Sequence, residues 1–338
     1  MKVIMISRDK GVLDKESAVS HRIAEYKELF DDLEVVFIGG QWKIFSFLSA
    51  FPRAAWIARR FGKGAWITSQ DPFESGIVAL SIAKLFGLRL QFQLHTDVFS
   101  YFYPRHSLMN FCRMICTRAL IPRANSLRVV SEKIRNEIVE RHLLPEQKIF
   151  VLPIYVEKEN DVHGPSYDLR AKYPEFEKII LIVARLEREK NLPLALESFQ
   201  KVLRGMPKAG LVILGEGRQR AKLRDFARHL NIIESVRFEG WQTDTASAYQ
   251  SADLLLVTSF YEGYGMNIIE ALAAGCPVVS TDVGIAGEAG AIISNYDAGD
   301  IALKSLEILR QNKRGVLSSG VANLTKQEYL EKFKNTFV

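Results

Sequence analysis

Short apolar runs alternate with segments of helical spacing along most of the 338-residue chain. Residues 2–7 form an apolar run, and in residues 19–30 apolar side chains recur every three to four positions. The same pattern predicts strands at 33–39, 65–70, 88–96, 126–131 and 148–153, with helices at 74–87 and 131–143. Strands that alternate with helices of about 10–15 residues are typical of parallel βαβ units, so we expect an α/β fold.

The pattern stops and then restarts in the middle of the chain. Residues 155–178 are polar and contain Gly164, Pro165 and Pro174, which we interpret as a linker. A second series then predicts strands at 179–186, 209–215, 236–240, 253–259 and 277–282, with helices at 191–204, 218–231, 244–252 and 265–275. The architecture of the first series therefore recurs, although its sequence does not.

We predict two doubly wound domains, at residues 1–155 and 156–322, and a helix at 323–338. The last helix is expected because residues 325–338 are amphipathic, and we expect it to pack back on the first domain. In open parallel sheets, ligands lie outside the carboxyl ends of the strands. Functional residues should therefore follow the strands directly.

The charge of the chain is unevenly placed, although apolar content of 48% and charged content of 25% are ordinary for a soluble globular protein. Residues 1–155 carry 22 basic and 15 acidic residues, and the remainder carries 23 and 24. Within 41–128 the balance is 12 basic to 3 acidic. This asymmetry suggests an anionic partner for the first domain alone, namely a membrane, a nucleic acid or an acidic substrate.

The cysteines and the chain start suggest a reducing, cytoplasmic compartment. Cys112 and Cys116 lie four apart on one face of a predicted helix, and without further ligands at metal spacing we expect buried thiols. No export segment is visible in "MKVIMISRDK", and no run reaches the roughly 18 apolar residues of a membrane span.

Two loops after predicted strands carry candidate phosphate and base contacts. Arg185 follows a strand, and Lys190 precedes a helix for which Asn191 is the expected cap. Two cations beside a helix start suit a diphosphate, although on this segment alone a solvated charged loop is preferred. Gly215 and Gly217 allow a flat ligand to approach the backbone, and an ordinary turn explains them equally well.

The stretch "FYEGYGMNIIEALAAG" places two carboxylates around the start of an apolar helix. Glu262 lies in the turn, and Glu270 lies about 6 Å along the helix from Met266. A carboxylate accepts hydrogen bonds from two vicinal hydroxyls, so the pair suits the two ends of a nucleoside diphosphate sugar. Glu270 has apolar neighbours, which favours this function over an ordinary surface glutamate.

Over residues 180–290 these motifs, in this order, resemble the donor-binding half of family 4 glycosyltransferases, which have the GT-B architecture. The resemblance implies that Arg185 and Lys190 hold the donor diphosphate. It also implies that Glu262 binds the transferred sugar and Glu270 the ribose. Further contacts implied by the resemblance are the glycines near the base, the turn at the sugar and phosphate, and a polar strand end facing the sugar: Gly215, Gly217, Gly263, Tyr264, Gly265, Met266, Asn267, His95 and Asp97. Taken alone, His95 would be a structural histidine.

The resemblance implies a retaining transferase that needs no metal or other cofactor. The donor would be a UDP- or GDP-sugar, and the acceptor a glycan or lipid-linked molecule in cell-envelope or surface polysaccharide synthesis. Two departures from the family motivate an alternative, a catalytically degenerate nucleotide-sugar-binding partner of another transferase. No glycine lies between Gly11 and Gly39, and the chain is short after Glu288.

A basic and aromatic segment in the first domain is a candidate membrane or acceptor surface. Residues 41–63 combine these side chains without an acid, and residues 105–123 have a similar composition. The candidates are Trp42, Lys43, Trp56, Arg59, Arg60 and Lys63. Such a surface suits the inner face of an anionic membrane, with a pair of core-covering helices bearing snorkelling arginines as the alternative. Nucleic acid is disfavoured because no nucleic-acid-binding module is present.

Overall fold

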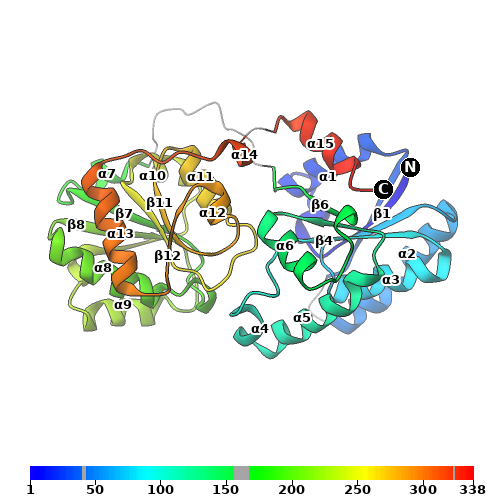
Figure 1. Ribbon diagram of the computed structural model, residues 1–338, viewed down its shortest axis with the longest axis horizontal. Helices are drawn as coiled ribbons and strands as arrows, with labels where there is room; N and C mark the ends of the chain where they lie inside the picture. Colours follow the sequence, from blue (N-terminus) through cyan, green and yellow to red (C-terminus); the bar gives the residue numbers. More distant parts are fainter. Residues whose placement is uncertain (40–42, 156–166, 323) are drawn as a thin grey trace. The chain divides into compact units, whose positions relative to one another are not determined.

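A computed structural model describes residues 1–39, 43–155, 167–322 and 324–338. The chain divides into two compact units, Met1–Val156 with Leu324–Val338, and Glu157–Asn323. Each unit contains a six-stranded parallel sheet with helices against it (Figure 1). The predicted α/β architecture of two doubly wound sheets is therefore confirmed.

The first sheet has the strand order β2-β1-β3-β4-β5-β6. Its strands are β1 (Lys2–Ser7), β2 (Asp32–Phe37), β3 (Trp66–Ser69), β4 (Arg89–Leu94), β5 (Ser126–Val129) and β6 (Ile149–Val151). Strands such as β1 are buried on both faces, which explains why they are continuous apolar runs in the sequence. The strand order changes direction between β1 and β3.

The second sheet has the order β12-β11-β10-β7-β8-β9. Its strands are β7 (Lys178–Val183), β8 (Ala209–Leu214), β9 (Val236–Gly240), β10 (Leu254–Val257), β11 (Val278–Thr281) and β12 (Ile292–Ser294). The chain builds outward from β7 to β9 and then returns to place β10 on the other side of β7. The point between β7 and β10 is a topological switch point, where doubly wound folds bind ligands.

The helices of the first unit form two layers over its sheet. They are α1 (Ala18–Leu29), α2 (Lys43–Phe61), α3 (Glu74–Phe86), α4 (Tyr103–His106), α5 (Leu108–Leu120), α6 (Glu132–Glu140) and α15 (Lys326–Lys334), with 3-10 turns at Lys10–Leu13, Ile121–Arg123 and Glu146–Lys148. α2 contacts α3, α3 contacts α5, and α1 contacts α15. The predicted cap is present at α6, where Ser131 accepts from the backbone of Ile134, and Gly87 ends α3 in the left-handed conformation.

The second unit contains α7 (Leu169–Lys172), α8 (Leu192–Gly205), α9 (Arg220–His229), α10 (Thr245–Ser251), α11 (Met266–Ala273), α12 (Ala286–Ala289), α13 (Ala298–Gln311) and α14 (Ser319–Ala322), with 3-10 turns at Arg188–Lys190 and Ile233–Ser235. α8 and α13 contact each other, and α8 contributes Leu196 and Phe199 to the core. Part of the predicted linker, 156–166, lies outside the described residues. Tyr155 belongs to the first unit, whereas residues 167–178 belong to the second, where Leu169 is fully buried and its backbone nitrogen donates to Ser251.

The C-terminal helix α15 closes the first unit. Phe333 is fully buried and stacks on Tyr26 of α1 at 4.3 Å between ring centroids. Buried polar groups of the sheet also find partners here. The Gln91 amide donates to the carbonyl and hydroxyl of Thr336, and the Arg128 guanidinium donates to the Tyr329 hydroxyl at 2.9 Å. The helix and the residues that follow it therefore satisfy polar groups of the core as well as covering its apolar part.

Replacing Phe333 with alanine should destabilise the first unit by about 3–5 kcal/mol, since it deletes a fully buried ring from a packed aromatic cluster. Urea unfolding would measure the loss. Leu85→Ala is the control, because this α3 side chain is exposed and its truncation should change stability by less than about 0.5 kcal/mol. Equal, small effects of both changes would show that α15 does not stabilise the unit.

Candidate donor-binding site

The site is built on the loops that follow β7 and β10, the two strands at the switch point of the second sheet. The Phe260 backbone nitrogen donates to the Glu189 carbonyl at 2.8 Å. The Thr258 hydroxyl donates to the carbonyls of Lys190 and Asn191 at 3.1 Å. These bonds fasten the two loops together, although they are more than sixty residues apart in the chain.

Lys190 and Glu262 form an ion pair between these loops. The Lys190 Nζ lies 2.7 Å from both carboxylate oxygens of Glu262. The Ser259 hydroxyl donates to Oε1 of the same carboxylate at 2.6 Å. Glu262 is only 9% exposed, so its charge is stabilised by these donors and little by water. The structure thus joins two predicted site residues directly.

Arg185 is the second predicted cation of the site and has a different environment. It follows β7 and pairs with Glu189 at 3.0 Å, four residues further on. Its side chain is 69% exposed.

Asn191 begins α8 as expected, but its φ is +49° and its side chain makes no capping bond, so the predicted side-chain cap is wrong. Its backbone instead accepts from Thr258.

The turn before α11 is held by the backbone at the start of α12 and by strand β7. Gly265 is the N-cap residue of α11 and has a φ of +91°, a left-handed conformation that favours glycine. The Tyr264 carbonyl accepts from Ile285 at 3.0 Å. The Asn267 amide donates to the Val183 carbonyl of β7 at 3.2 Å. Asn267 therefore anchors the helix start to the sheet, a role not anticipated from the sequence.

Glu270 is partly buried on α11, as its apolar neighbours suggested. The Tyr249 hydroxyl, from α10, donates to its Oε2 at 3.2 Å. Burial, and then the Glu270 charge, raise the pKa of Tyr249 well above its ordinary value, so this phenol remains a donor. Tyr249 is a positioning residue for Glu270 that the sequence motifs did not reveal.

The loop that contains the two predicted glycines follows β8 and packs against the loop that follows β7. Gly215 has a φ of +134°, and a Cβ there would lie 1.9 Å from the Ala184 carbonyl oxygen. A Cβ on Gly217 would lie 2.5 Å from the Leu186 carbonyl oxygen. Glycine is therefore required by the close packing of these two loops, whether or not a base binds there.

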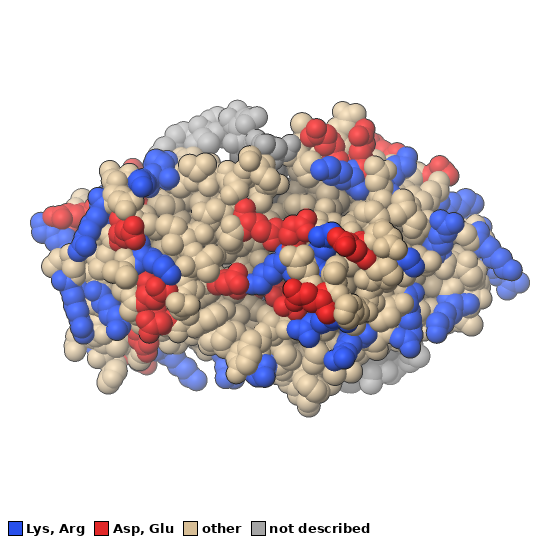
Figure 2. All heavy atoms as spheres, viewed as in Figure 1, with Lys and Arg blue, Asp and Glu red and all other residues tan. Residues whose placement is uncertain are grey.

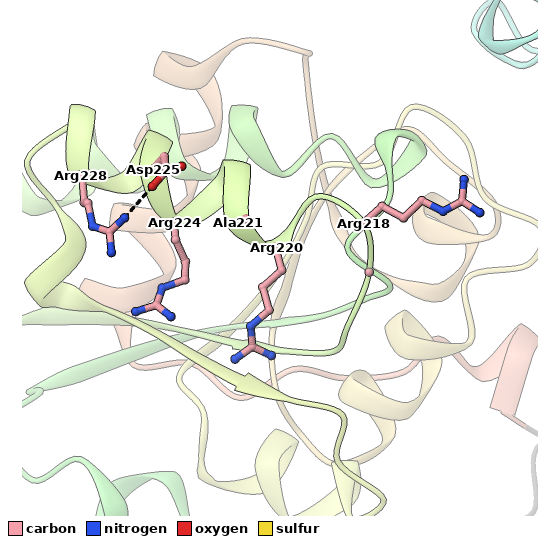
Figure 3. A pocket seen from close by; sticks show the side chains of 7 residues that line it. Arg218, Arg220, Ala221, Arg224, Asp225 and Arg228 are labelled. Carbon is pink, nitrogen blue, oxygen red and sulfur yellow. Dashed lines mark hydrogen bonds and ion pairs between the residues drawn. The ribbon is translucent and has the colours of Figure 1, made fainter.

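The same loop opens on a groove of about 460 Å³ along α9. Arginines line it, as Figure 3 shows, with Arg220 and Arg224 projecting from the same side of the helix. Arg220 pairs with Glu216, and Arg228 pairs with Asp225 at 2.5 Å. Arginines at positions 220, 224 and 228 were the visible signal of this groove in the sequence, since residues four apart share a helix face.

The two predicted polar residues of the first domain, His95 and Asp97, follow β4 of the first unit. Among the described residues, neither His95 Nε2 nor Asp97 Oδ1 has a hydrogen-bond partner, and both atoms are buried. Burial, with Arg128 and Arg22 nearby, lowers the pKa of His95 to about 3, so the imidazole is neutral at pH 7. Burial raises the pKa of Asp97, and Lys133 opposes this effect.

The switch point of the first sheet carries polar residues to which the sequence assigned no individual role. The Ser7 hydroxyl, at the end of β1, donates to Gln70 Oε1 at 2.6 Å. Glu74 begins α3 and pairs with Arg8 at 2.7 Å and with Arg113 at 3.1 Å. The signal was available, since residues 7–8 and 70–74 each follow a predicted strand.

The predicted basic surface lies partly on the described end of α2. Trp42 and the side chain of Lys43 lie outside the described residues. Arg59 and Lys63 are exposed, and Arg60 pairs with Asp32 at 3.2 Å and with Glu34 at 2.8 Å. Trp56 is exposed with Arg60 over its ring.

The structure confirms that the two neighbouring cysteines lie on one helix, but it does not bury both of their thiols. Cys112 and Cys116 both belong to α5, as their spacing indicated. Cys112 is exposed and Cys116 is partly buried, so the expectation of two buried thiols is wrong. Within the described ranges, no three His, Cys, Asp or Glu side chains form a group able to hold a metal ion. In the same ranges, no helix combines the length and the hydropathy needed to span a bilayer.

Two family models match nearly the whole chain. The model of Glycosyltransferase Family 4 matches residues 3–159, and that of Glycosyl transferases group 1 matches residues 168–317. The chain belongs to glycosyltransferase family 4. The match to residues 168–317 falls within the second structural unit, and the match to residues 3–159 covers the first unit from residue 3 and ends just past its boundary at Val156.

Individual relatives are more distant. An uncharacterised glycosyltransferase of Methanocaldococcus jannaschii is 32% identical over 46% of the chain and 42% of its own length. An alpha-monoglucosyldiacylglycerol synthase of Streptococcus pneumoniae is 26% identical over 68% of the chain and 54% of its own length. The chain thus spans about half the length of these relatives. Anabaena HepE, solved with UDP and glucose, shares the fold with a TM-score of 0.68, 16% identity and coverage of 93% of this chain and 91% of its own.

Gly215→Ala should destabilise the second unit by on the order of 2–4 kcal/mol, because the new methyl group would collide with the Ala184 carbonyl at a left-handed φ. Thermal or urea unfolding would measure this. Gly287→Ala is the matched control, since its Cβ would meet nothing closer than 3.9 Å. That change should lie within about 1 kcal/mol of the parent protein. A harmless Gly215→Ala would contradict the loop packing.

His95→Gln should flatten the pH dependence of stability between about pH 6.5 and pH 4. In this window the unfolded histidine binds a proton and the folded one, with a pKa of about 3, does not, so stability falls as pH falls. Melting temperatures across the window measure the slope. The matched control is His229→Gln, which removes an imidazole at an exposed position of the other unit. An unchanged slope in His95→Gln would refute a neutral His95 in the folded protein.

Proposed function

We propose that this protein is a retaining glycosyltransferase that moves a sugar from a nucleoside diphosphate sugar to a glycan or lipid-linked acceptor. The observation that carries the proposal is the Lys190–Glu262 pair beside Arg185 at the switch point of the second sheet. A diphosphate needs cations, and a sugar needs paired acceptors. This arrangement supplies both from adjacent loops.

In the proposed reaction, the bond from the anomeric carbon to the diphosphate breaks and a bond to an acceptor hydroxyl forms. The acceptor proton passes to the leaving phosphate oxygen. Arg185, Lys190 and the amino-terminal end of α11 stabilise the negative charge that develops on the diphosphate. Glu262 and Glu270 accept hydrogen bonds from sugar and ribose hydroxyls, with Tyr249 fixing the second carboxylate. We propose that these cations make a metal ion unnecessary.

Similar proteins support the substrate classes of this proposal. The name of the streptococcal relative gives an alpha-linked glucose on diacylglycerol, and the HepE structure holds UDP and glucose. We therefore propose a UDP- or GDP-sugar as donor and cell-envelope or surface glycan synthesis as the setting. We also propose that the protein acts at the inner face of a membrane, as a peripheral protein. Nucleic acid is not expected to be a partner.

The donor site can be tested by thermal stabilisation with uridine and guanosine diphosphates and their sugars. A ligand at 100 times its dissociation constant should add about 2.7 kcal/mol of stability. The gain should disappear in Arg185→Ala and Glu270→Ala and persist in Arg188→Ala, an exposed arginine of the same loop. No stabilisation by any of these nucleotides, or equal losses in all three variants, would refute the donor assignment.

Turnover separates the enzyme from the alternative of a degenerate binding partner. Donor consumption with an acceptor panel, unaffected by a chelator, is the expected result, and NMR of the product should show the anomeric configuration of the donor. Binding that persists without any turnover would favour the partner role. An inverted product, or activity lost on chelation, would refute retention or metal independence respectively.

A further inference from the structure

Helix α5 presents an apolar stripe that no described residue of its unit covers. Leu108, Phe111 and Ile115 are 79%, 47% and 48% exposed, and exposed Cys112 lies between them. Positions 108, 111, 112 and 115 follow the spacing of one helical face. Single exposed apolar residues are ordinary on a protein surface, but a continuous stripe marks an interaction site.

The opposite face of α5 fixes this orientation. Asn110, Thr117 and Leu120 are buried. Arg113 pairs with Glu74 at 3.1 Å, which ties α5 to the start of α3. The helix start is also capped, because the Ser107 hydroxyl accepts from the Asn110 backbone at 3.1 Å. The stripe therefore points away from the sheet. It cannot turn inward without breaking the ion pair between Arg113 and Glu74.

The charge around the stripe has one sign. Residues 98–131 contain five arginines and no acidic residue. Arg118 and Arg123 are exposed at the end of α5, and Arg105 lies before it, over the ring of Tyr101 at 3.9 Å. Arginines that flank an apolar helix face match a surface with anionic head groups outside and hydrocarbon within.

The neighbouring helices extend the same character. α2, α3 and α5 contact one another in series. In their described parts the single acidic residue is Glu74, which is already paired with Arg8 and Arg113. Figure 2 shows basic side chains gathered over the region of α2 and α5 in this unit. The outward charge of this layer is therefore predominantly positive among the described residues, since Glu74 is its one acid and is paired with two arginines.

We infer that α5 is the element that inserts into an anionic lipid surface, with Leu108, Phe111 and Ile115 entering the acyl boundary and Arg105, Arg118 and Arg123 contacting the head groups. A nucleic acid would satisfy the arginines but would leave the apolar stripe in water. A bilayer interface satisfies both. The inference rests on the peripheral location proposed above and does not depend on the transfer reaction.

Cys112 offers a direct probe of insertion, because it is exposed within the stripe. A nitrobenzoxadiazole label on Cys112 of Cys116→Ser protein should shift to the blue and brighten with phosphatidylglycerol vesicles and stay unchanged with phosphatidylcholine vesicles. The same label on a Leu303→Cys, Cys112→Ser, Cys116→Ser protein, on exposed α13, should not respond. Vesicle co-sedimentation without a shift at Cys112 would overturn the role of α5. Absence of co-sedimentation would overturn the peripheral location as well, and nucleotide stabilisation would still report on the donor site.

Serine variants test the stripe against a matched control. The Leu108→Ser, Phe111→Ser, Ile115→Ser protein should lose at least about tenfold in partitioning to anionic vesicles. The Ile292→Ser, Leu303→Ser, Val316→Ser protein, changed at exposed apolar positions of the other unit, should partition as the parent does. Removing Arg118 and Arg123 as glutamines should cost about fivefold for each charge and reduce the salt dependence. Unchanged partitioning of the stripe variant, or equal losses in the control, would overturn the inference. So would retained RNA binding by the stripe variant with no vesicle binding by the parent.

Discussion

The buried ion pair between Lys190 and Glu262 is the interaction on which the candidate donor site depends. A carboxylate that is 9% exposed has little solvation by water, so its charge needs a partner at contact distance. Lys190 provides that partner at 2.7 Å to both oxygens. Removing Lys190 would leave the Glu262 carboxylate buried without a counter-charge and, among its described partners, with the Ser259 hydroxyl, which is far more costly than never having buried the pair. The two loops are therefore coupled by electrostatics as well as by backbone bonds.

Around this pair the two predicted cations have different mechanical properties. Lys190 is held by the carboxylate, whereas Arg185 is exposed and bonded to a neighbour on its own loop. A charge fixed in place is preorganised for a ligand, and an exposed guanidinium can adjust to the ligand's shape and use two parallel donors. Tyr249 orients Glu270 through one hydrogen bond from its neutral hydroxyl at 3.2 Å, whereas Lys190 holds Glu262 through an ion pair. Each carboxylate of the signature thus has a dedicated protein donor.

The strands were predictable from the sequence because buried parallel strands are continuous apolar runs. The candidate site residues were predictable because binding residues directly follow such strands. Which of these residues contact one another was not predictable from the sequence, since those contacts depend on the order of the strands in the sheet. Lys190 meets Glu262 because β10 returns to lie beside β7, and no local pattern encodes that return. Asn191 was expected to cap α8 through its side chain, but its left-handed backbone turns the side chain away from that role. The exposure of Cys112 depends on which face of α5 meets the sheet, and its own spacing leaves that choice open.

The first unit uses its terminal helix to satisfy a buried guanidinium of its sheet. Arg128 is 3% exposed and, among its described partners, is satisfied by oxygens of Gln93, Leu152 and Tyr329. Because α15 supplies Tyr329, the terminal helix is part of the core, and its loss would remove one of the acceptors of a buried guanidinium. The layer of α2, α3 and α5 differs from α15, because part of its surface is not needed for the core. Its inward side chains pack on the sheet, and its outward ones contribute little to folding, so their apolar and basic character is free to serve an external surface.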